Sequence, residues 1–164
     1  MLELRRYQGE DLEPCRGLWS ELTEWHRAIY ENPTIGGPDP GRHFDEHLAK
    51  VGGENLWVAV RDEKVVGLAG LMGEGEEVEI EPVVVSGPHR ESGVGSMLVE
   101  AVVEEARRRG VKYLSVRPVA RNLKALEFFA KRGFVNVGHI ELFMDLTGGN
   151  WRSGLRLFGR ELRY

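Results

Sequence analysis

The chain has 164 residues, a length that suits one domain able to bury most of its apolar surface in a single core. Its net charge of −4, with both signs spread along the sequence, provides no polybasic face for nucleic acid or anionic lipid. The lone Cys15 can form neither an internal disulfide nor a cysteine metal pair, which predicts a reducing, cytoplasmic location. Because Met1 to Gln8 alternate apolar and charged residues, we expect neither a signal peptide nor a membrane span.

The first half of the chain predicts two helices and an antiparallel meander. Leu2 and Leu4 indicate a first strand, and apolar residues recur at helical spacing from Asp11 to about Tyr30. Three prolines and three glycines make Asn32 to Gly41 a loop. Further along, the patterns predict a short helix at Arg42 to Val51 and strands at Leu56 to Val60, Val65 to Met72 and Val78 to Val85.

The second half alternates helices and strands. The predicted elements are a helix at Ser96 to Arg109, a short buried strand at Tyr113 to Val116, a helix at Asn122 to Lys131 and a last core strand at His139 to Leu146. Together these elements predict an α/β (α+β) fold with a mixed, mostly antiparallel central sheet flanked by helices. The extension Thr147 to Tyr164 is too apolar for a free tail, and we expect it to pack on the core or to form a homodimer.

The segment Val83 to Ser96 carries the main chemical signal. It consists of a valine-rich strand and then a turn with Gly93 and Gly95 immediately before a helix, in the sequence VVVSGPHRESGVGS. The first backbone N–H groups of a helix lack partners and lie at the positive end of its dipole, so they can hold a diphosphate. The alternative interpretation is ordinary turn chemistry, because glycine before a helix is common.

Two ordered motifs carry a family resemblance. Arg90-x-x-Gly93-x-Gly95 resembles the coenzyme A pyrophosphate loop of the GNAT superfamily of acyl-CoA N-acyltransferases. Asn122-x-x-Ala125-x-x-Phe128-Phe129, followed by Gly133-Phe134, is similar to the later helix of that superfamily. The resemblance covers Leu2 to Leu146 and implies one domain over residues 1–164, with a core of about 1–146 and an extension of 147–164. It also implies a splayed strand pair that holds coenzyme A.

The resemblance assigns roles toward acetyl-CoA, the implied cosubstrate. The strand backbone at Val83, Val84 and Val85 would pair with the pantetheine arm, Asn122 would hydrogen-bond that arm, and Phe129 would flank the thioester. The amides that would bind the pyrophosphate are those of Arg90, Glu91, Ser92, Gly93, Val94, Gly95 and Ser96. Other interpretations stay open: Asn122 also suits a helix N-cap, and at least one phenylalanine of the pair Phe128 and Phe129 packs in the core.

Amine acetylation needs a base for the amine and hydrogen-bond donors for the oxyanion. Glu79 and Glu81 lie two residues apart on one strand, so both face the same side. Glu81 matches the position where the superfamily places a carboxylate base, with Glu79 as its neighbour and the N–H of Val84 or Val85 as oxyanion donor. The alternative is that Glu77, Glu79 and Glu81 form a solvated strand face.

One position departs from the superfamily. Where the later helix usually offers a tyrosine to protonate the leaving thiolate, this chain has Phe129, and Ser115, Tyr30 and His26 are the candidate substitutes. No metal site is predicted, because the pair His43 and His47 lacks the glutamate of a metalloprotease helix.

Three functions remain open at the level of the sequence. The first is an N-acetyltransferase acting on a primary amine of a small molecule or peptide by direct transfer. The second is a noncatalytic acyl-CoA-binding module, and the third is a nucleotide-binding regulator.

Overall fold

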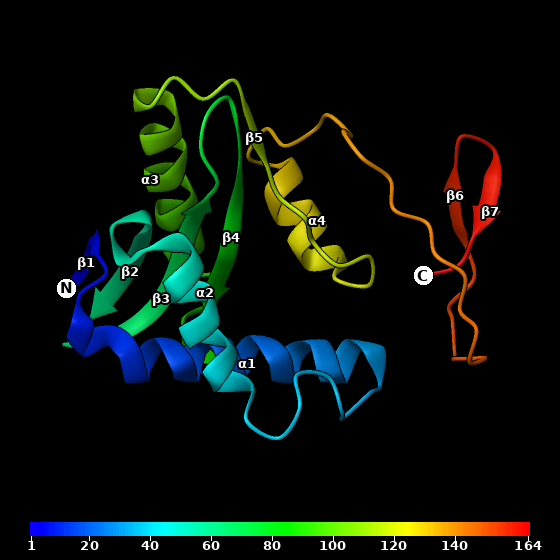
Figure 1. The fold of residues 1–164 in the computed structure, drawn as a ribbon, viewed down its shortest axis with the longest axis horizontal. Coiled ribbons are helices and arrows are strands. Elements are labelled where there is room, and N and C mark those ends of the chain that lie inside the picture. Colours follow the sequence, from blue (N-terminus) through cyan, green and yellow to red (C-terminus); the bar gives the residue numbers. More distant parts are fainter. The chain divides into compact units, whose positions relative to one another are not determined.

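The computed structural model describes residues 1–164 and divides into two compact units, Met1–Val116 and Arg117–Tyr164 (Figure 1). The first unit holds a five-stranded sheet in the order β1-β2-β3-β4-β5. Its strands are β1 Leu2–Arg6, β2 Leu56–Arg61, β3 Lys64–Met72, β4 Glu77–Val85 and β5 Tyr113–Ser115. All neighbouring strands are antiparallel except β4 and β5, which are parallel. The predicted mixed, mostly antiparallel sheet is therefore confirmed.

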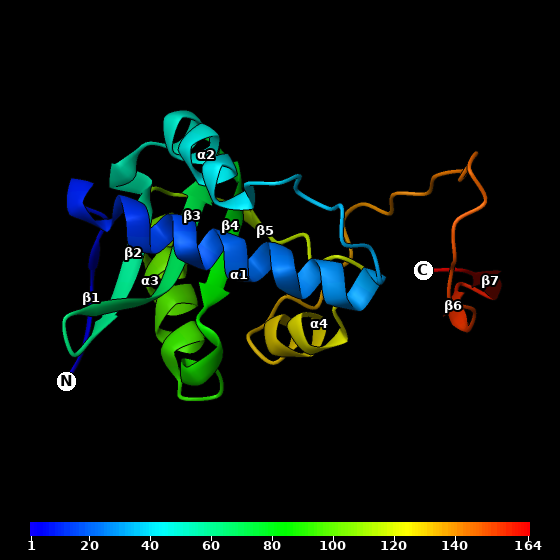
Figure 2. The same cartoon turned by 90° about the horizontal axis from the view of Figure 1, so that it is seen from below.

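Three helices cover the two faces of this sheet. They are α1 Leu12–Tyr30, α2 His43–Val51 and α3 Val94–Arg108. Leu68 of β3 is fully buried in a cluster with residues of α1 and α2, whereas the neighbouring Gly67 lies directly beneath Leu98 of α3. Because successive strand residues point to opposite faces, α3 packs on the face opposite to α1 and α2, as Figure 2 shows. None of the helices is both long enough and apolar enough to cross a bilayer.

The loop rich in proline and glycine that follows α1 is held against that helix. Arg27 donates from Nε to the carbonyl oxygen of Ile35 at 2.8 Å and from Nη2 to that of Gly37 at 2.5 Å. Gly36 has a φ of +74°, and a Cβ there would lie 2.7 Å from the side chain of Thr23. The loop therefore follows the surface of α1 closely, which a larger residue at Gly36 would prevent.

A β-bulge interrupts the pairing of β3 with β4. Leu71 pairs with Ile80 and Ala69 pairs with Val83, so Gly70 alone opposes two residues of β4, Glu81 and Pro82. A Cβ on Gly70 would lie 2.3 Å from the carbonyl oxygen of Glu81. Only glycine lets the two backbones approach so closely at this point.

The second unit contains helix α4 Leu123–Ala130 and a hairpin of β6 Leu155–Leu157 and β7 Arg160–Leu162. The N-cap residue of α4 is Asn122, whose side chain accepts a hydrogen bond from the N–H of Ala125 at 3.1 Å. Such a cap satisfies one of the donors that every helix start leaves unpaired.

One predicted strand is absent, and another is present but less buried than predicted. The segment His139 to Leu146 has no strand pairing, and Leu142 and Leu146 are 70% and 86% exposed. Its alternating pattern needs a sheet edge as partner, whereas in this unit β6 and β7 pair only with each other. The strand predicted as buried at Tyr113 to Val116 ends at Ser115, and Tyr113 is 66% exposed because β5 lies at the edge of its sheet.

Candidate functional site

The turn before α3 has the backbone shape that the sequence indicated. Glu91 and Gly93 have positive φ values of 63° and 86°, and Gly93 is the N-cap residue of α3. The helix begins at Val94, two residues before the predicted start at Ser96. Val94 and Gly95 are therefore first-turn residues, whose N–H groups have no acceptor within the helix. The N–H groups that would bind a diphosphate thus sit at the positive end of a 15-residue helix.

Two side chains of helix α1, those of Glu21 and Trp25, contact this turn and the residues just before it. The carboxylate of Glu21 accepts a hydrogen bond from the N–H of Gly87 at 2.9 Å. Arg90 donates from Nε to the carbonyl oxygen of Val85 at 3.1 Å, and its guanidinium lies 5.0 Å from the centre of the Trp25 ring. Inside the turn, the hydroxyl of Ser92 donates to the carbonyl oxygen of His89 at 2.6 Å. The turn is therefore positioned by side chains and by its own backbone, since the N–H of Arg90 already donates to the carbonyl oxygen of Gly87 at 3.3 Å.

The edge of β4 that faces β5 is only partly paired. β5 pairs with Glu77, Val78 and Glu79 and goes no further, so no strand of this unit pairs with that edge at Val83 to Val85. On its other edge, the same stretch pairs with β3. A separation of two parallel neighbours leaves N–H and C=O groups that an extended ligand can pair with. The pairing of β4 with β5 thus ends before the residues that lead directly into the turn.

The acidic residues of β4 differ in burial. Glu77 is exposed, Glu79 is 8% exposed and Glu81 is intermediate. Glu79 pairs with Met72, which packs with the core cluster beneath α1 and α2. A fully solvated strand face is therefore wrong for Glu79, since its carboxylate lies on the covered face of the sheet. Glu81 sits in the bulge, two residues before Val83.

His47 of α2 is a residue that the sequence did not connect with this site. It is 7% exposed, lies 5.0 Å from the Trp19 ring and lies near Glu81 in the bulge. Its Nε2 is buried without a hydrogen-bond partner. Burial lowers the pKa of His47 below 6.5, although the nearby Glu81 carboxylate acts in the opposite direction. A neutral imidazole therefore packs against the bulge that carries Glu81.

A signal for His47 was present in the sequence. The buried residues of α2 are Phe44, His47 and Val51, which recur at the spacing of a helix face that packs on the core. His43 lies elsewhere on the helix, with its Nε2 3.1 Å from the carbonyl oxygen of Gly36. The two histidines thus have separate surroundings.

Two predicted cosubstrate residues, Asn122 and Phe129, belong to the second unit. The side chain of Asn122 caps α4, as one of its two interpretations expected. Phe129 is 7% exposed and packs edge-on against Phe128 and Phe134, with ring centres 5.1 and 5.6 Å away. Core packing therefore accounts for Phe129 within its unit, and the roles of both residues toward a cosubstrate stay predictions.

The candidate proton donors and the lone thiol have the following surroundings. The hydroxyl of Ser115 donates to the carbonyl oxygen of Val78 at 3.3 Å. Burial lowers the pKa of His26, which favours a neutral ring. Cys15 is fully buried, and burial raises the pKa of its thiol to about 12. A thiol held in this form is a packing residue rather than a nucleophile.

Comparison with protein families agrees with this geometry. The model of the acetyltransferase (GNAT) family matches residues 19–134, more than half of the chain. The chain belongs to this family. The match spans β4, the turn and α3, so the strand and turn described above are those of a GNAT acetyltransferase domain. No curated protein matches the chain.

Solved structures with the same fold include several acetyltransferases. A structure described as a transcriptional regulator from Bacillus halodurans C-125 is 25% identical, with a TM-score of 0.66, covering 89% of this chain and all of that one. The PaiA N-acetyltransferase from Thermoplasma acidophilum, in complex with coenzyme A, is 16% identical, with a TM-score of 0.68 and coverage of 81% and 89%. The aminoglycoside N-acetyltransferase AAC(6')-Iy, bound to a bisubstrate analogue, is 18% identical, with a TM-score of 0.65 and coverage of 88% and 98%.

Proposed function

We propose that this GNAT protein is an N-acetyltransferase that moves an acetyl group from acetyl-CoA to a primary amine by direct transfer. The observation that carries the proposal is the continuity of three features on one stretch of chain. The half-buried Glu81 sits in the bulge, the unpaired edge at Val83 to Val85 follows it, and the turn at Gly93 leads into α3. A base, a slot for an extended cosubstrate and a diphosphate cradle thus succeed one another along the chain.

The residues divide the reaction between them. Glu81 accepts a proton from the attacking amine, directly or through water, while the amine nitrogen bonds to the thioester carbon. Of the two expected oxyanion donors, Val85 has its N–H on the unpaired edge, because N–H directions alternate along the strand and that of Ser86 is bonded to Val66 of β3. This N–H donates to the carbonyl oxygen as negative charge develops on it. The carbon–sulfur bond then breaks, and the thiolate leaves. Because a thiol has an ordinary pKa near 8.5, water protonates the thiolate in this proposal, in place of the tyrosine that Phe129 replaces.

Glu79 and His47 support the base in this proposal. Glu79 lies two residues before Glu81 on the face covered by α1 and α2, and the neutral His47 lies near Glu81. His47 acts as a positioning residue, because its buried ring packs beside the bulge from which the Glu81 side chain projects. The amine is that of a small molecule or a peptide. Among similar folds, AAC(6')-Iy is bound to an acetylneamine analogue and an N-acetylglutamate synthase to N-acetyl-glutamate.

Thiol release from acetyl-CoA across a panel of amines tests the proposal. The panel contains an aminoglycoside, a polyamine, amino acids and short peptides with free N-termini. We expect at least one amine to accelerate thiol release, and Glu81→Gln to reduce that acceleration about 10²- to 10³-fold while acetyl-CoA still binds. The matched control is Glu77→Gln, since Glu77 lies on the same strand but is exposed. If acetyl-CoA binds and no amine accelerates release, the enzyme proposal fails.

The second candidate is a noncatalytic acyl-CoA-binding module. The replacement of the family's tyrosine by Phe129 supports it, as does the description of the 25% identical structure as a transcriptional regulator. A thermal shift assay with different ligands distinguishes the two forms of this candidate, an acyl-CoA sensor and a nucleotide-binding regulator. Stabilisation by acetyl-CoA without amine-dependent thiol release identifies an acyl-CoA sensor, whereas stabilisation by ATP or NAD instead identifies a nucleotide-binding regulator.

We extend the proposal to the domain organisation, location, partners and oligomeric state of the protein. Residues 1–164 act as one functional domain in the cytoplasm, with acetyl-CoA and the amine as partners and without nucleic acid, membrane or metal. The extension 147–164, which carries Trp151 and Phe158, supports a homodimer. Light scattering of the full chain, and of a chain truncated after Leu146, tests that part separately.

A further inference from the structure

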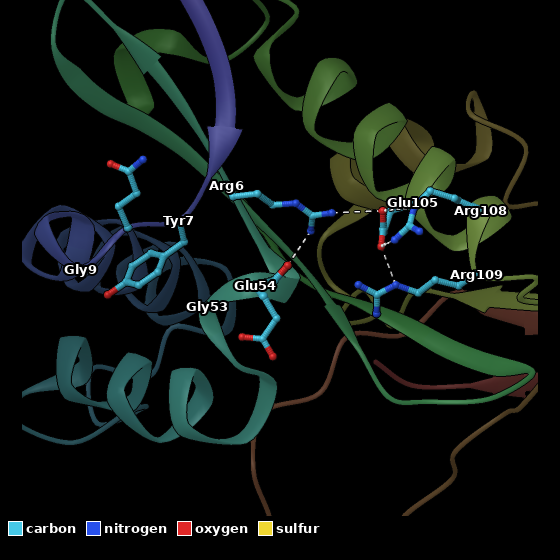
Figure 3. A pocket seen from close by; sticks show the side chains of 9 residues that line it. Arg6, Tyr7, Gly9, Gly53, Glu54, Glu105, Arg108 and Arg109 are labelled. Atoms are coloured by element: carbon cyan, nitrogen blue, oxygen red, sulfur yellow. Dashed lines mark hydrogen bonds and ion pairs between the residues drawn. The ribbon is translucent and has the colours of Figure 1, made fainter.

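A second hollow lies in the first unit, away from the acetyl-CoA turn. It has a volume of about 650 Å³ and is built from the end of β1, the turn between β1 and α1, the segment before β2 and the end of α3. Figure 3 shows the residues that line it, which are Arg6, Tyr7, Gln8, Gly9, Gly53, Glu54, Glu105, Arg108 and Arg109. The volume is within the usual range of small-molecule sites.

Three guanidinium groups converge on a single carboxylate in this hollow. Glu105 is 8% exposed and pairs with Arg6 Nη2 at 3.1 Å, Arg108 Nη2 at 2.6 Å and Arg109 Nε at 2.6 Å. The pairs hold the pKa of Glu105 at about 2, so it is fully ionised near neutral pH. Three positive charges and the carboxylate that they share leave an excess of two positive charges in the cluster, and Glu54 lowers the excess of the whole lining to one. That excess contrasts with the net charge of −4 of the whole chain.

The guanidinium groups are held in place before any ligand binds. Arg6 lies 3.7 Å from the centre of the Trp57 ring and donates from Nη1 to the carbonyl oxygen of Glu54 at 2.7 Å. Arg109 donates from Nη2 to the side chain of Asn55 at 2.6 Å. In Figure 3 the Glu54 carboxylate points away from the guanidinium groups. Positioned donors lose little conformational entropy on binding, which favours affinity.

Unused donors and unbalanced charge remain at the rim. No protein group accepts from Nη1 of Arg108 or of Arg109, and the side chain of Arg108 is 71% exposed. Burial, together with the charges of Arg109 and Arg108, lowers the pKa of Arg6, although Glu105 opposes this effect. An anion placed between the three arginines would accept from the free donors and offset this repulsion.

The helix dipole does not account for the whole cluster. Cationic residues at the C-terminal end of α3 interact favourably with its dipole, which is a sufficient reason for Arg107 and Arg108. Arg6 comes from β1, about a hundred residues earlier in the sequence, and would not be required for that purpose. The convergence of separate elements is typical of a binding site.

We propose that this hollow binds the phosphate group of a phosphorylated small molecule. A phosphate monoester carries nearly two negative charges near neutral pH, and the lining of the hollow is net positive. Guanidinium groups match phosphate geometry with paired N–H donors. The hollow lies at the opposite end of α3 from the turn at Gly93, and a 15-residue helix is about 22 Å long. The site is therefore distinct from the diphosphate cradle, and its positive charge would repel the amine substrate.

Isothermal titration of the full chain with inorganic phosphate tests this site. Ionic strength is kept constant with sodium chloride, and each titration is repeated with saturating coenzyme A to occupy the other end of α3. We expect phosphate to bind in both cases, and Arg108→Gln to weaken it about tenfold, the loss of one charge-assisted hydrogen bond. The matched control is Arg107→Gln. Arg107 pairs with Glu104 on the same helix and does not line the hollow. The phosphate affinity of Arg107→Gln should therefore stay within twofold of that of the unsubstituted protein.

A second variant separates binding from folding. Glu105→Gln removes the carboxylate that competes for the guanidinium donors, and we expect it to tighten phosphate binding. A purely structural ion-pair cluster would show no phosphate binding in any variant. The proposal is overturned if phosphate shows no binding above the sodium chloride background. It is also overturned if Arg107→Gln and Arg108→Gln weaken phosphate binding equally. Succinate binding as tight as phosphate would reassign the site to dicarboxylates. If Glu105→Gln does not fold, the phosphate affinities of Arg107→Gln and Arg108→Gln still test the proposal. They do so whether or not the protein binds coenzyme A.

Discussion

The two ends of α3 both present hydrogen-bond donors, but they do so by different means. At the N-terminal end the donors are backbone amides, aimed by the positive φ angles of Glu91 and Gly93. At the C-terminal end they are guanidinium groups, aimed by Glu105, Asn55 and Trp57. The first arrangement depends on consecutive residues, so a sequence motif reveals it. The second depends on elements far apart in the chain and becomes visible only in the folded structure.

The largest effect is expected for Glu81→Gln, which should lower activity and leave binding at both ends of α3 unchanged. We expect kcat for amine acetylation to fall about 10²- to 10³-fold, since a positioned base contributes that much. Affinity for coenzyme A and for phosphate should not change, because Glu81 belongs to neither set of donors. Steady-state kinetics and titration calorimetry measure these quantities. A small loss of kcat would show that water or another group accepts the proton.

The bulge offers the next largest effect. Gly70→Ala places a Cβ 2.3 Å from the carbonyl oxygen of Glu81, so β3 and β4 must separate. We expect the free energy of unfolding to fall by about 2 kcal/mol, a typical cost of overpacking, and acetylation to fall with it. Urea unfolding gives the first quantity. Gly17→Ala is the control: no heavy atom lies within 4 Å of a Cβ there, and alanine in a helix interior should be neutral or stabilising.

At the N-terminal end of α3, Gly93→Ala probes the backbone donors directly. The φ of +86° costs an L-residue about 1 kcal/mol or more, and relaxation of the turn would move the amides. We expect coenzyme A to bind about tenfold more weakly, and phosphate binding at the other end of α3 to be unaffected. Gly87→Ala, which has open space and no positive φ, should retain its affinity. Equal effects of the two variants would mean that the positive φ is unimportant.

The smallest expected effect concerns pH. Because burial lowers the pKa of His47 below 6.5, the unfolded chain binds a proton more readily than the folded one. The free energy of unfolding should therefore fall as the pH drops through 6.5, and His47→Gln should reduce that slope. Urea unfolding at pH 7.5 and pH 5.5 measures it, with the exposed His43→Gln as control. An unchanged slope in His47→Gln would contradict the assignment. In an active enzyme, the same variant should lower kcat more than it changes KM.

Local patterns predicted most of the fold. The strands β1 to β4, helices α1 to α4 and the Asn122 cap all follow from periodicity and cap residues near in sequence. The turn motif was equally local. The bulge at Gly70 was not predictable, because it depends on which residue of β4 pairs with Leu71. His47 was considered only together with His43, although its spacing from Phe44 and Val51 already placed it on the buried face of α2.

The segment His139 to Leu146 shows the opposite failure. Alternation of apolar and polar residues describes a strand that has found a partner, and the pattern alone does not say whether a partner is at hand. Arg6 and Arg109 escaped attention for a related reason. Each is an ordinary charged residue in its own neighbourhood, and only the fold brings the two to the same hollow.

The burial of Cys15 makes the chain convenient for site-selective chemistry. A thiol with a pKa of about 12 and no exposed surface reacts slowly with maleimides, which require the thiolate. A variant such as Arg107→Cys would therefore carry a single reactive sulfur. A fluorophore attached there would report on occupancy at the C-terminal end of α3 without removal of the native cysteine.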